Sequence, residues 1–266
     1  MKRSRIALAL GDLAPNMFNK VKIVFWYAYF AIRHRLNILP AFSINVRIVI
    51  FGHECRLIVS DISDFWTMKD VLVDKDYDVE FGGQPKVILD LGGNIGISSL
   101  YFALKYPAAT VHVFEPDPFS FKRLEKNISG LSNVRAYQYA ISAEPATVDF
   151  QHSQTSVHSS VVSKSSDESV IKVNAIDLDG ALQLAGVTTI DICKFDIEGS
   201  ERYIFDGFKG FKSVRNYIGE MHYDKMSLKP QDIRSIAEKN GYMYHERFIV
   251  PGKRSIVKIW KSSSTK

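Results

Sequence analysis

The chain has 266 residues, of which 46% are hydrophobic and 24% are charged, and it contains 2 cysteines. This composition is that of a folded globular chain and excludes disordered, collagen-like and disulfide-stapled proteins. The length fits one large domain, or one domain with a smaller extension. Cys55 and Cys193 lie in apolar runs, so we expect buried thiols in a reducing compartment, the cytoplasm, and not metal ligands.

The net charge of +5 is concentrated at the two ends of the chain. Residues 1–39 carry +6 and residues 245–266 carry +5, whereas the segment between them carries −6. Because the basic residues do not follow one binding face, we expect no nucleic-acid partner.

Residues 1–80 are predicted to be an extension ahead of the main domain at 81–266. Its first element is a helix over residues 17–36, in which an apolar run from Ile23 to Ile32 is bracketed by lysines and arginines. This run does not span a bilayer, which takes roughly 20 apolar residues, and no signal-type cleavage site follows it. The helix either packs on the domain or makes a peripheral contact with an anionic membrane or a partner.

The rest of the extension is predicted to be a hairpin, Ile44–Ile50 with Cys55–Val59, followed by a helix over residues 64–72. From Lys86 strands alternate with helices, which is the pattern of a parallel sheet covered on both faces. The predicted strands are Lys86–Leu91, Thr110–Phe114, Val134–Ile141, Asp191–Phe195 and Tyr217–Glu220, then a terminal hairpin of Tyr242–Val250 and Ser255–Trp260. The predicted helices are Ile97–Lys105, Phe119–Asn127, Leu178–Leu184, Ser200–Phe205 and Pro230–Asn240.

One expected helix is missing between Ala146 and Asn174, where the sequence is strand-like and rich in serine. This segment is either a solvated loop or hairpin, or a lip over the active site, since long loops in compact domains tend to be functional.

A glycine-rich turn follows the first strand of the main domain, with the pattern D-x-G-x-N-x-G from Asp90 to Gly96. A strand, a glycine turn and a helix place a ligand at the carboxyl end of the strand. The dinucleotide fingerprint fails, because positions 94 and 97 are Asn and Ile where it requires glycine, and no P-loop motif occurs.

The polar residues around this turn indicate which ligand it holds. Glu115 follows the second strand, 25 positions after Asp90, where a carboxylate accepts hydrogen bonds from ribose hydroxyls. Asp90 and Asn94 suit the ammonium and carboxylate of an amino-acid tail better than a pyrophosphate. A ribose diol joined to a zwitterionic tail describes S-adenosylmethionine.

A second polar group follows the next parallel strands. Asp196 and Glu198 leave the sheet after one strand, and Glu220 and His222 end the next, so all four face the ligand crevice. Asp196 or Glu198 either orients or deprotonates an acceptor, or caps the helix near Ser200. Histidine is the natural general base near neutral pH. Such a cluster could hold a divalent cation, but we predict no metal site.

Together these motifs resemble the FkbM-type methyltransferases of the class I S-adenosylmethionine-dependent fold. The resemblance covers roughly residues 86–222 and includes F-E-P at 114–116, K-F-D-I-E-G-S-E at 194–201 and G-E-M-H at 219–222. It implies an α/β fold with a doubly wound, mostly parallel seven-stranded sheet and an antiparallel C-terminal hairpin. Gly93 stands where alanine is common in this family.

The resemblance also implies O-methylation of a hydroxyl, with S-adenosylmethionine as donor and a sugar, glycan or secondary metabolite as acceptor. The expected cofactor-binding residues are Asp90, Gly92, Gly93, Asn94, Gly96, Glu115, Pro116 and Ala140. The expected catalytic residues are Asp196, Glu198, Glu220 and His222. Our hypothesis from the sequence is that Glu220 and His222 assist deprotonation, while Asp196 and Glu198 position the cofactor or the acceptor.

Two other functions fit a sheet of this kind. A nucleotide-dependent oxidoreductase is disfavoured by the failed glycine pattern. A non-catalytic scaffold, anchored through its basic ends, is disfavoured by the intact Asp90, Gly92, Asn94, Gly96 and Glu115. The oligomeric state is left open.

Overall fold

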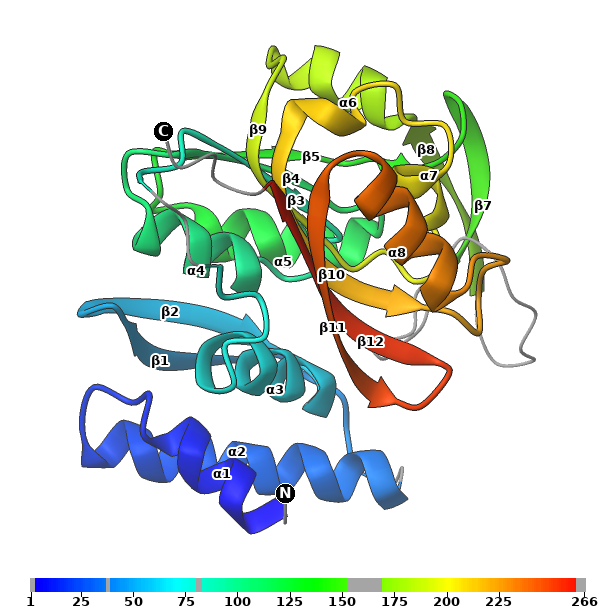
Figure 1. Ribbon diagram of the computed structural model, residues 1–266. Helices are drawn as coiled ribbons and strands as arrows, with labels where there is room; N and C mark the ends of the chain where they lie inside the picture. The colour runs from blue at the N-terminus through cyan, green and yellow to red at the C-terminus, as the bar shows by residue number, and fades with distance from the viewer. Residues whose placement is uncertain (1–2, 37–38, 80–82, 153–168, 262–266) are drawn as a thin grey trace.

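The computed structural model describes residues 3–36, 39–79, 83–152 and 169–261. Its centre is a seven-stranded sheet with the order β11-β12-β10-β9-β3-β4-β5 (Figure 1). The strands are β3 Val87–Leu91, β4 Thr110–Phe114, β5 Val134–Tyr137, β9 Ile190–Phe195, β10 Val214–His222, β11 Tyr242–Val250 and β12 Arg254–Lys261. Strands β5, β4, β3, β9 and β10 are parallel, and β12 pairs antiparallel with β10 and β11. The predicted α/β class, sheet and terminal hairpin are confirmed.

Helices cover both faces of this sheet, as predicted. They are α4 Ile97–Lys105, α5 Pro118–Ile128, α6 Leu178–Ala185, α7 Arg202–Phe205 and α8 Pro230–Lys239, with a 3-10 turn η2 at Phe211–Ser213. Successive side chains on β3 point to opposite faces, so Ile88 packs in the core with α4 and α5 while Leu89 packs in the core with α6, α7 and α8. A parallel strand covered on both sides reads as a continuous apolar run, which is why the strands stood out in the sequence.

The N-terminal extension contains α1 Arg3–Gly11, α2 Met17–Leu36, β1 Ile44–Ile50, β2 His53–Val59, α3 Ile62–Met68 and a π-helical turn η1 at Lys69–Val73. Helix α1 was not predicted. The hairpin lies between α2 and the helices of the main domain, with β1 against α2 and β2 against α5 (Figure 1). Its turn is the two residues Phe51 and Gly52, tighter than expected, because both adopt positive φ angles of 48° and 83°.

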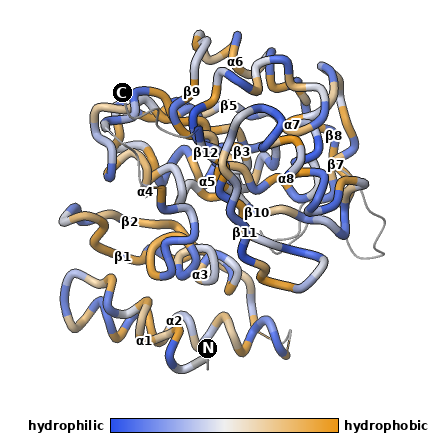
Figure 2. Tube along the Cα trace, viewed as in Figure 1, coloured by the Kyte–Doolittle hydropathy of each residue, from blue (hydrophilic) through white to orange (hydrophobic). Residues whose placement is uncertain are grey.

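Apolar residues of the extension belong to the same buried cluster as α4 and one face of the sheet. Figure 2 shows this apolar interior and the apolar middle of α2. The division at residue 80 stays a prediction. Cys193 is buried as expected, whereas Cys55 is only half-buried, because it lies near the turn of the hairpin where the cover ends.

The prediction of one strand over Val134–Ile141 is wrong. The chain leaves the main sheet after Tyr137 and continues as β6 Ala140–Ile141, which pairs with β8 in a separate sheet. This second sheet also holds β7 Ala146–His152, antiparallel to β8 Ser169–Ile176. The predicted serine-rich lip or loop falls largely on residues 153–168, which lie outside the described residues.

Candidate active site

A cleft lies where β3, β4 and β9 end. Eight of the predicted site residues line it: Gly92, Gly93, Asn94, Glu115, Pro116, Ala140, Asp196 and Glu198. Asp90, Gly96, Glu220 and His222 do not line the cleft. Asp90, Gly96 and His222 each contact a residue that does, and Glu220 contacts His222.

The glycine turn is shaped by close backbone contacts. Gly92 has a φ of +77°, and a Cβ there would lie 1.9 Å from the carbonyl oxygen of Asp196. A Cβ on Gly93 would lie 2.1 Å from Cγ2 of Val113. Gly93, which stands where alanine is common in the family, therefore leaves the space that the Val113 side chain occupies against this turn.

We expect Gly92→Ala to lower the free energy of unfolding by about 2–4 kcal/mol, because the added Cβ meets backbone and forces a left-handed residue. The matched control is Gly130→Ala, since a Cβ on Gly130 meets nothing within 4 Å. Urea unfolding of both variants measures the difference, and equal stabilities would show that the turn relaxes freely.

Asn94 and Glu115 join the ends of β3 and β4. The backbone N–H of Asn94 donates to Oε2 of Glu115 at 2.7 Å, and the N–H of Asp117 donates to Oε1 at 2.9 Å. Burial raises the pKa of Glu115 to about 7. Asn94 has a positive φ of 49°, and its Oδ1 is buried without a hydrogen-bond partner among the described residues. Because Asn94 lines the cleft, this oxygen is a candidate acceptor for a ligand there.

A buried ion pair lies beneath the turn. Lys194 is 2% exposed and Asp90 is fully buried, with 3.0 Å between Nζ and Oδ1. Nζ also donates to the carbonyl oxygen of Gly92 at 2.7 Å, while Asp90 Oδ2 accepts from the hydroxyls of Ser98 at 2.7 Å and Ser99 at 2.6 Å. The pair ties β3, β9 and the first turn of α4 together.

The sequence motifs assign no role to Lys194, although it is the first residue of K-F-D-I-E-G-S-E at 194–201. A charge inside an apolar strand was the available signal, because buried charges are almost always paired. Tyr77, which comes from the extension, was also missed. Its ring lies 5.2 Å below the Lys194 ammonium, and its hydroxyl donates to Oδ2 of Asp196 at 3.0 Å.

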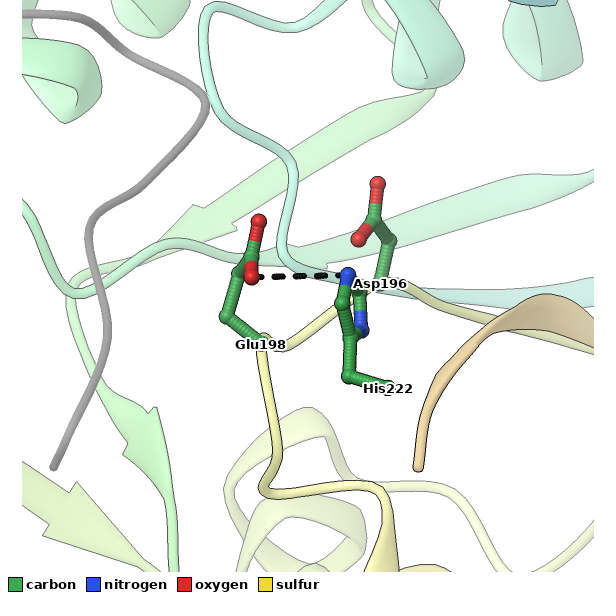
Figure 3. Close-up of side chains that lie close together, drawn as sticks. All are labelled: Asp196, Glu198 and His222. Carbon is green, nitrogen blue, oxygen red and sulfur yellow. Dashed lines mark ion pairs between the residues drawn. The ribbon is translucent and has the colours of Figure 1, made fainter. Parts of the chain in front are cut away.

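Three of the four predicted catalytic residues, Asp196, Glu198 and His222, lie close together (Figure 3), and the fourth, Glu220, approaches His222. Nε2 of His222 lies 3.4 Å from Oε2 of Glu198 and 3.7 Å from Oε1 of Glu220. Nδ1 of His222 donates to Glu201 Oε1 at 2.8 Å, because a carboxylate only accepts. His222 is therefore held between Glu201 on one side and two carboxylates on the other.

Charge and burial shift the pKa values in this cluster. Burial acts to lower the pKa of His222, but the charge and hydrogen bond of Glu201 raise it to about 10. Burial, followed by the charge of Asp196, raises the pKa of Glu220 to about 8. Burial also raises the pKa of Glu198. His222 is consequently protonated at neutral pH, and in this cationic form it cannot accept a further proton.

Neither Asp196 nor Glu198 caps α7. Glu201 closes that turn instead, accepting from the N–H of Ile197 at 3.1 Å and of Gly199 at 2.7 Å. Glu198 has a positive φ of 54°, so the turn directs its side chain to the cluster, where it pairs with Lys225.

One wall of the cleft is apolar and aromatic. Phe114, Tyr139, Ile141 and Phe150 form this wall, and none of them was predicted as a site residue. Tyr139 and Ile141 lie within the strand wrongly predicted over residues 134–141, which hid their position, and Phe150 lies on β7 of the second sheet.

Comparison with known proteins gives a family for this arrangement. Residues 90–244 match the model of the methyltransferase FkbM domain. Methyltransferase sdnD of Sordaria araneosa is 26% identical over 219 residues, covering 69% of this chain and 84% of that protein. Hexuronic acid methyltransferase AglP of Haloferax volcanii is 25% identical over 190 residues, covering 70% and 76%. The 2-O-methyltransferase NoeI of Sinorhizobium fredii is 30% identical over 155 residues, covering 52% and 64%. The chain therefore belongs to the FkbM methyltransferase family.

Proposed function

We propose that this protein is an S-adenosylmethionine-dependent O-methyltransferase that acts on a hydroxyl of a sugar, glycan or secondary metabolite. The observation that carries the proposal is one cleft that joins a ribose-type acceptor, Glu115, to the carboxylates Asp196 and Glu198. The names of AglP and NoeI, which concern a hexuronic acid and 2-O-methylation, support a sugar acceptor.

The residues of the cleft fit the cofactor. Glu115 would accept from the ribose hydroxyls, and the unpartnered Oδ1 of Asn94 would accept from the ammonium of the methionine half. The aromatic and aliphatic wall around Phe114 and Ile141, beside Ala140, suits the adenine base. Asp90 would act indirectly, since its carboxylate is occupied by Ser98, Ser99 and Lys194 and holds the turn in place.

When bound, S-adenosylmethionine supplies an electrophilic methyl group on its sulfonium. The chain must then hold the acceptor hydroxyl in line, exclude water and remove one proton. We assign proton removal to Asp196, which lines the cleft and whose carboxylate accepts, among the described residues, only from the Tyr77 hydroxyl. Glu198, in contrast, is already paired with Lys225 and His222.

This assignment differs from the hypothesis drawn from the sequence, in which His222 and Glu220 were the base. Neither residue lines the cleft, and His222 is a cation at neutral pH because Glu201 raises its pKa. We therefore propose His222 as a positioning residue that orients Glu198 toward the acceptor.

Methyl transfer from labelled S-adenosylmethionine tests the proposal. The protein is incubated with a panel of free sugars, uronic acids and glycans, and mass spectrometry locates any added methyl group. The proposal expects an O-methyl ether on at least one hydroxylated acceptor. A methyl group found only on nitrogen or carbon would overturn the assignment as an O-methyltransferase.

The affinity for S-adenosylmethionine is expected to fall below neutral pH. Burial sets the Glu115 pKa at about 7, and only the carboxylate form accepts from both ribose hydroxyls. Between pH 7 and pH 6 the dissociation constant should rise about fivefold, since a carboxyl with a pKa of about 7 is about half ionised at pH 7 and about one-tenth ionised at pH 6. Calorimetry with Glu115→Gln is the control, because this variant loses the Glu115 part of the dependence.

We expect activity to survive removal of divalent metals. One ligand-type atom from each of Asp196, Glu198 and His222 lies within 4.8 Å of the others, but Lys225 pairs with Glu198 and Arg254 pairs with Glu220 at 3.5 Å. The chain's own cations already offset these carboxylates. Dialysis against EDTA followed by the methylation assay checks this, and activity lost to EDTA and restored by Mg²⁺ or Mn²⁺ would contradict it.

We propose the cytoplasm as the site of the reaction, because both cysteines are free thiols and a reducing compartment keeps them so.

A further inference from the structure

Helix α2 has two apolar faces, and only one of them is covered. Ile23, Tyr27 and Phe30 are buried against the hairpin and α3. On the opposite side five large apolar residues are exposed to about half or more, and we call them the α2 stripe: Phe18 68%, Val21 61%, Phe25 58%, Ile32 49% and Leu36 52%. Their spacing of three, four and seven residues aligns them along one side of the helix.

The surroundings of the α2 stripe are basic. Helix α2 contains no acidic residue, and it ends with Arg33, His34 and Arg35. Asp12 is the only acid among residues 3–36, and it is paired with Lys20 at 2.5 Å. Exposed Arg35 and Lys22 therefore flank the α2 stripe without nearby negative charge from the same two helices.

A basic groove continues from the C-terminal part of α2. It is bounded by Lys122 and Lys126 on α5, by Phe42, and by Arg33, which pairs with Asp61 at 3.2 Å. Among the described residues that line it, Asp117 alone is acidic, and the groove reaches Ser120, which also lines the cleft. Phe42 is 36% exposed and packs against Trp26, with 5.4 Å between ring centroids. Positive charge and exposed aromatic surface thus extend from α2 toward the cleft.

We propose that the α2 stripe lies in the headgroup region of a bilayer that contains anionic phospholipids. A helix with an apolar face and basic flanks binds such a surface through buried apolar area and attraction to anionic lipids. No helix in the described part of the chain is long and apolar enough to cross a membrane, and the proposed contact requires none.

Charge favours a bilayer over a second copy of this chain. Two α2 helices packed stripe to stripe would bring basic side chains together with no acidic residue on either helix. Like charges across such a seam disfavour the pairing, whereas anionic lipid headgroups complement them.

Vesicle sedimentation with the full chain tests the proposal. The vesicles contain phosphatidylcholine alone, or phosphatidylcholine and phosphatidylglycerol in equal parts. We expect binding only to the anionic vesicles, weakened by added salt because the attraction is screened. Phe25→Glu together with Ile32→Glu should lower the partition coefficient by at least about tenfold, since charges replace the apolar contact.

The matched control is Leu184→Glu on α6, which places a charge at another exposed leucine, 44% exposed. It should bind as the unchanged protein does. Circular dichroism checks that both variants fold. If a variant does not fold, the salt dependence of vesicle binding by the unchanged protein still tests the proposal.

No sedimentation of the unchanged protein with anionic vesicles, or equal binding by the double variant, would overturn the proposal. A dimer in analytical ultracentrifugation that the double variant dissociates, without vesicle binding, would assign the stripe to a second copy. The assay contains no cofactor, so its result does not depend on the proposed methyltransferase activity.

Discussion

Replacing Asp196 by asparagine is expected to lower kcat by roughly 10²- to 10⁴-fold, because the variant loses the group assigned to proton removal. Asparagine keeps the size of the side chain and still accepts from the Tyr77 hydroxyl, which lies 3.0 Å from Oδ2. Binding of S-adenosylmethionine should therefore change little. Rates at saturating acceptor, once an acceptor is known, measure the effect.

Two variants give this result its meaning. Asp206→Asn is the control, since Asp206 is an exposed residue that ends α7 outside the cleft. His222→Gln should reduce kcat less than Asp196→Asn if His222 orients Glu198. A rate near that of the unchanged protein for Asp196→Asn, with near-complete loss for His222→Gln, would return the role of base to His222.

Replacing Lys194 by methionine should lower the free energy of unfolding by about 3–5 kcal/mol, because it leaves the buried Asp90 without its cation. Urea unfolding measures this. The control is Lys172→Met, whose partner Asp149 is 69% exposed, so a change of about 1 kcal/mol or less is expected.

A double variant separates the ion pair from packing. Lys194→Met combined with Asp90→Asn should cost less than the sum of the two single changes, since no buried charge is left alone. Additive losses, or a change below about 1 kcal/mol for Lys194→Met alone, would contradict a structural role for the pair.

The main sheet could be predicted because its central strands, such as β3 and β4, are buried on both faces and are almost entirely apolar in sequence. The same signal misled at residues 134–141, where apolar residues continue while the chain changes sheets after Tyr137. Helix α1 was missed although Ala7 and Leu10 are buried, because the apolar residues from Ile6 to Leu10 form one short run without helical periodicity.

The polar residues of the cleft were predictable from their positions at strand ends. Parallel strands end at one edge of the sheet, so Asn94, Glu115, Asp196 and Glu198 had to meet there. The part played by each group depended on contacts that no local pattern shows. Tyr77 reaches Asp196 from 119 positions away, and Glu201 changes the protonation of His222.

The charge at the chain ends also became more specific in the structure. The sequence showed a basic N-terminal segment, but both faces of α2 are apolar and periodicity alone does not tell which face the domain covers. The structure leaves Phe18, Val21 and Phe25 exposed, so it identifies which face of the basic helix α2 is open to a partner.

Isothermal titration calorimetry with S-adenosylmethionine tests the central claim most directly. The account predicts one cofactor bound per chain, with affinity reduced by Glu115→Gln and by Asn94→Ala and unchanged by Leu184→Glu. Absence of S-adenosylmethionine binding to the folded chain, together with tight binding of a nicotinamide dinucleotide in the same experiment, would contradict it.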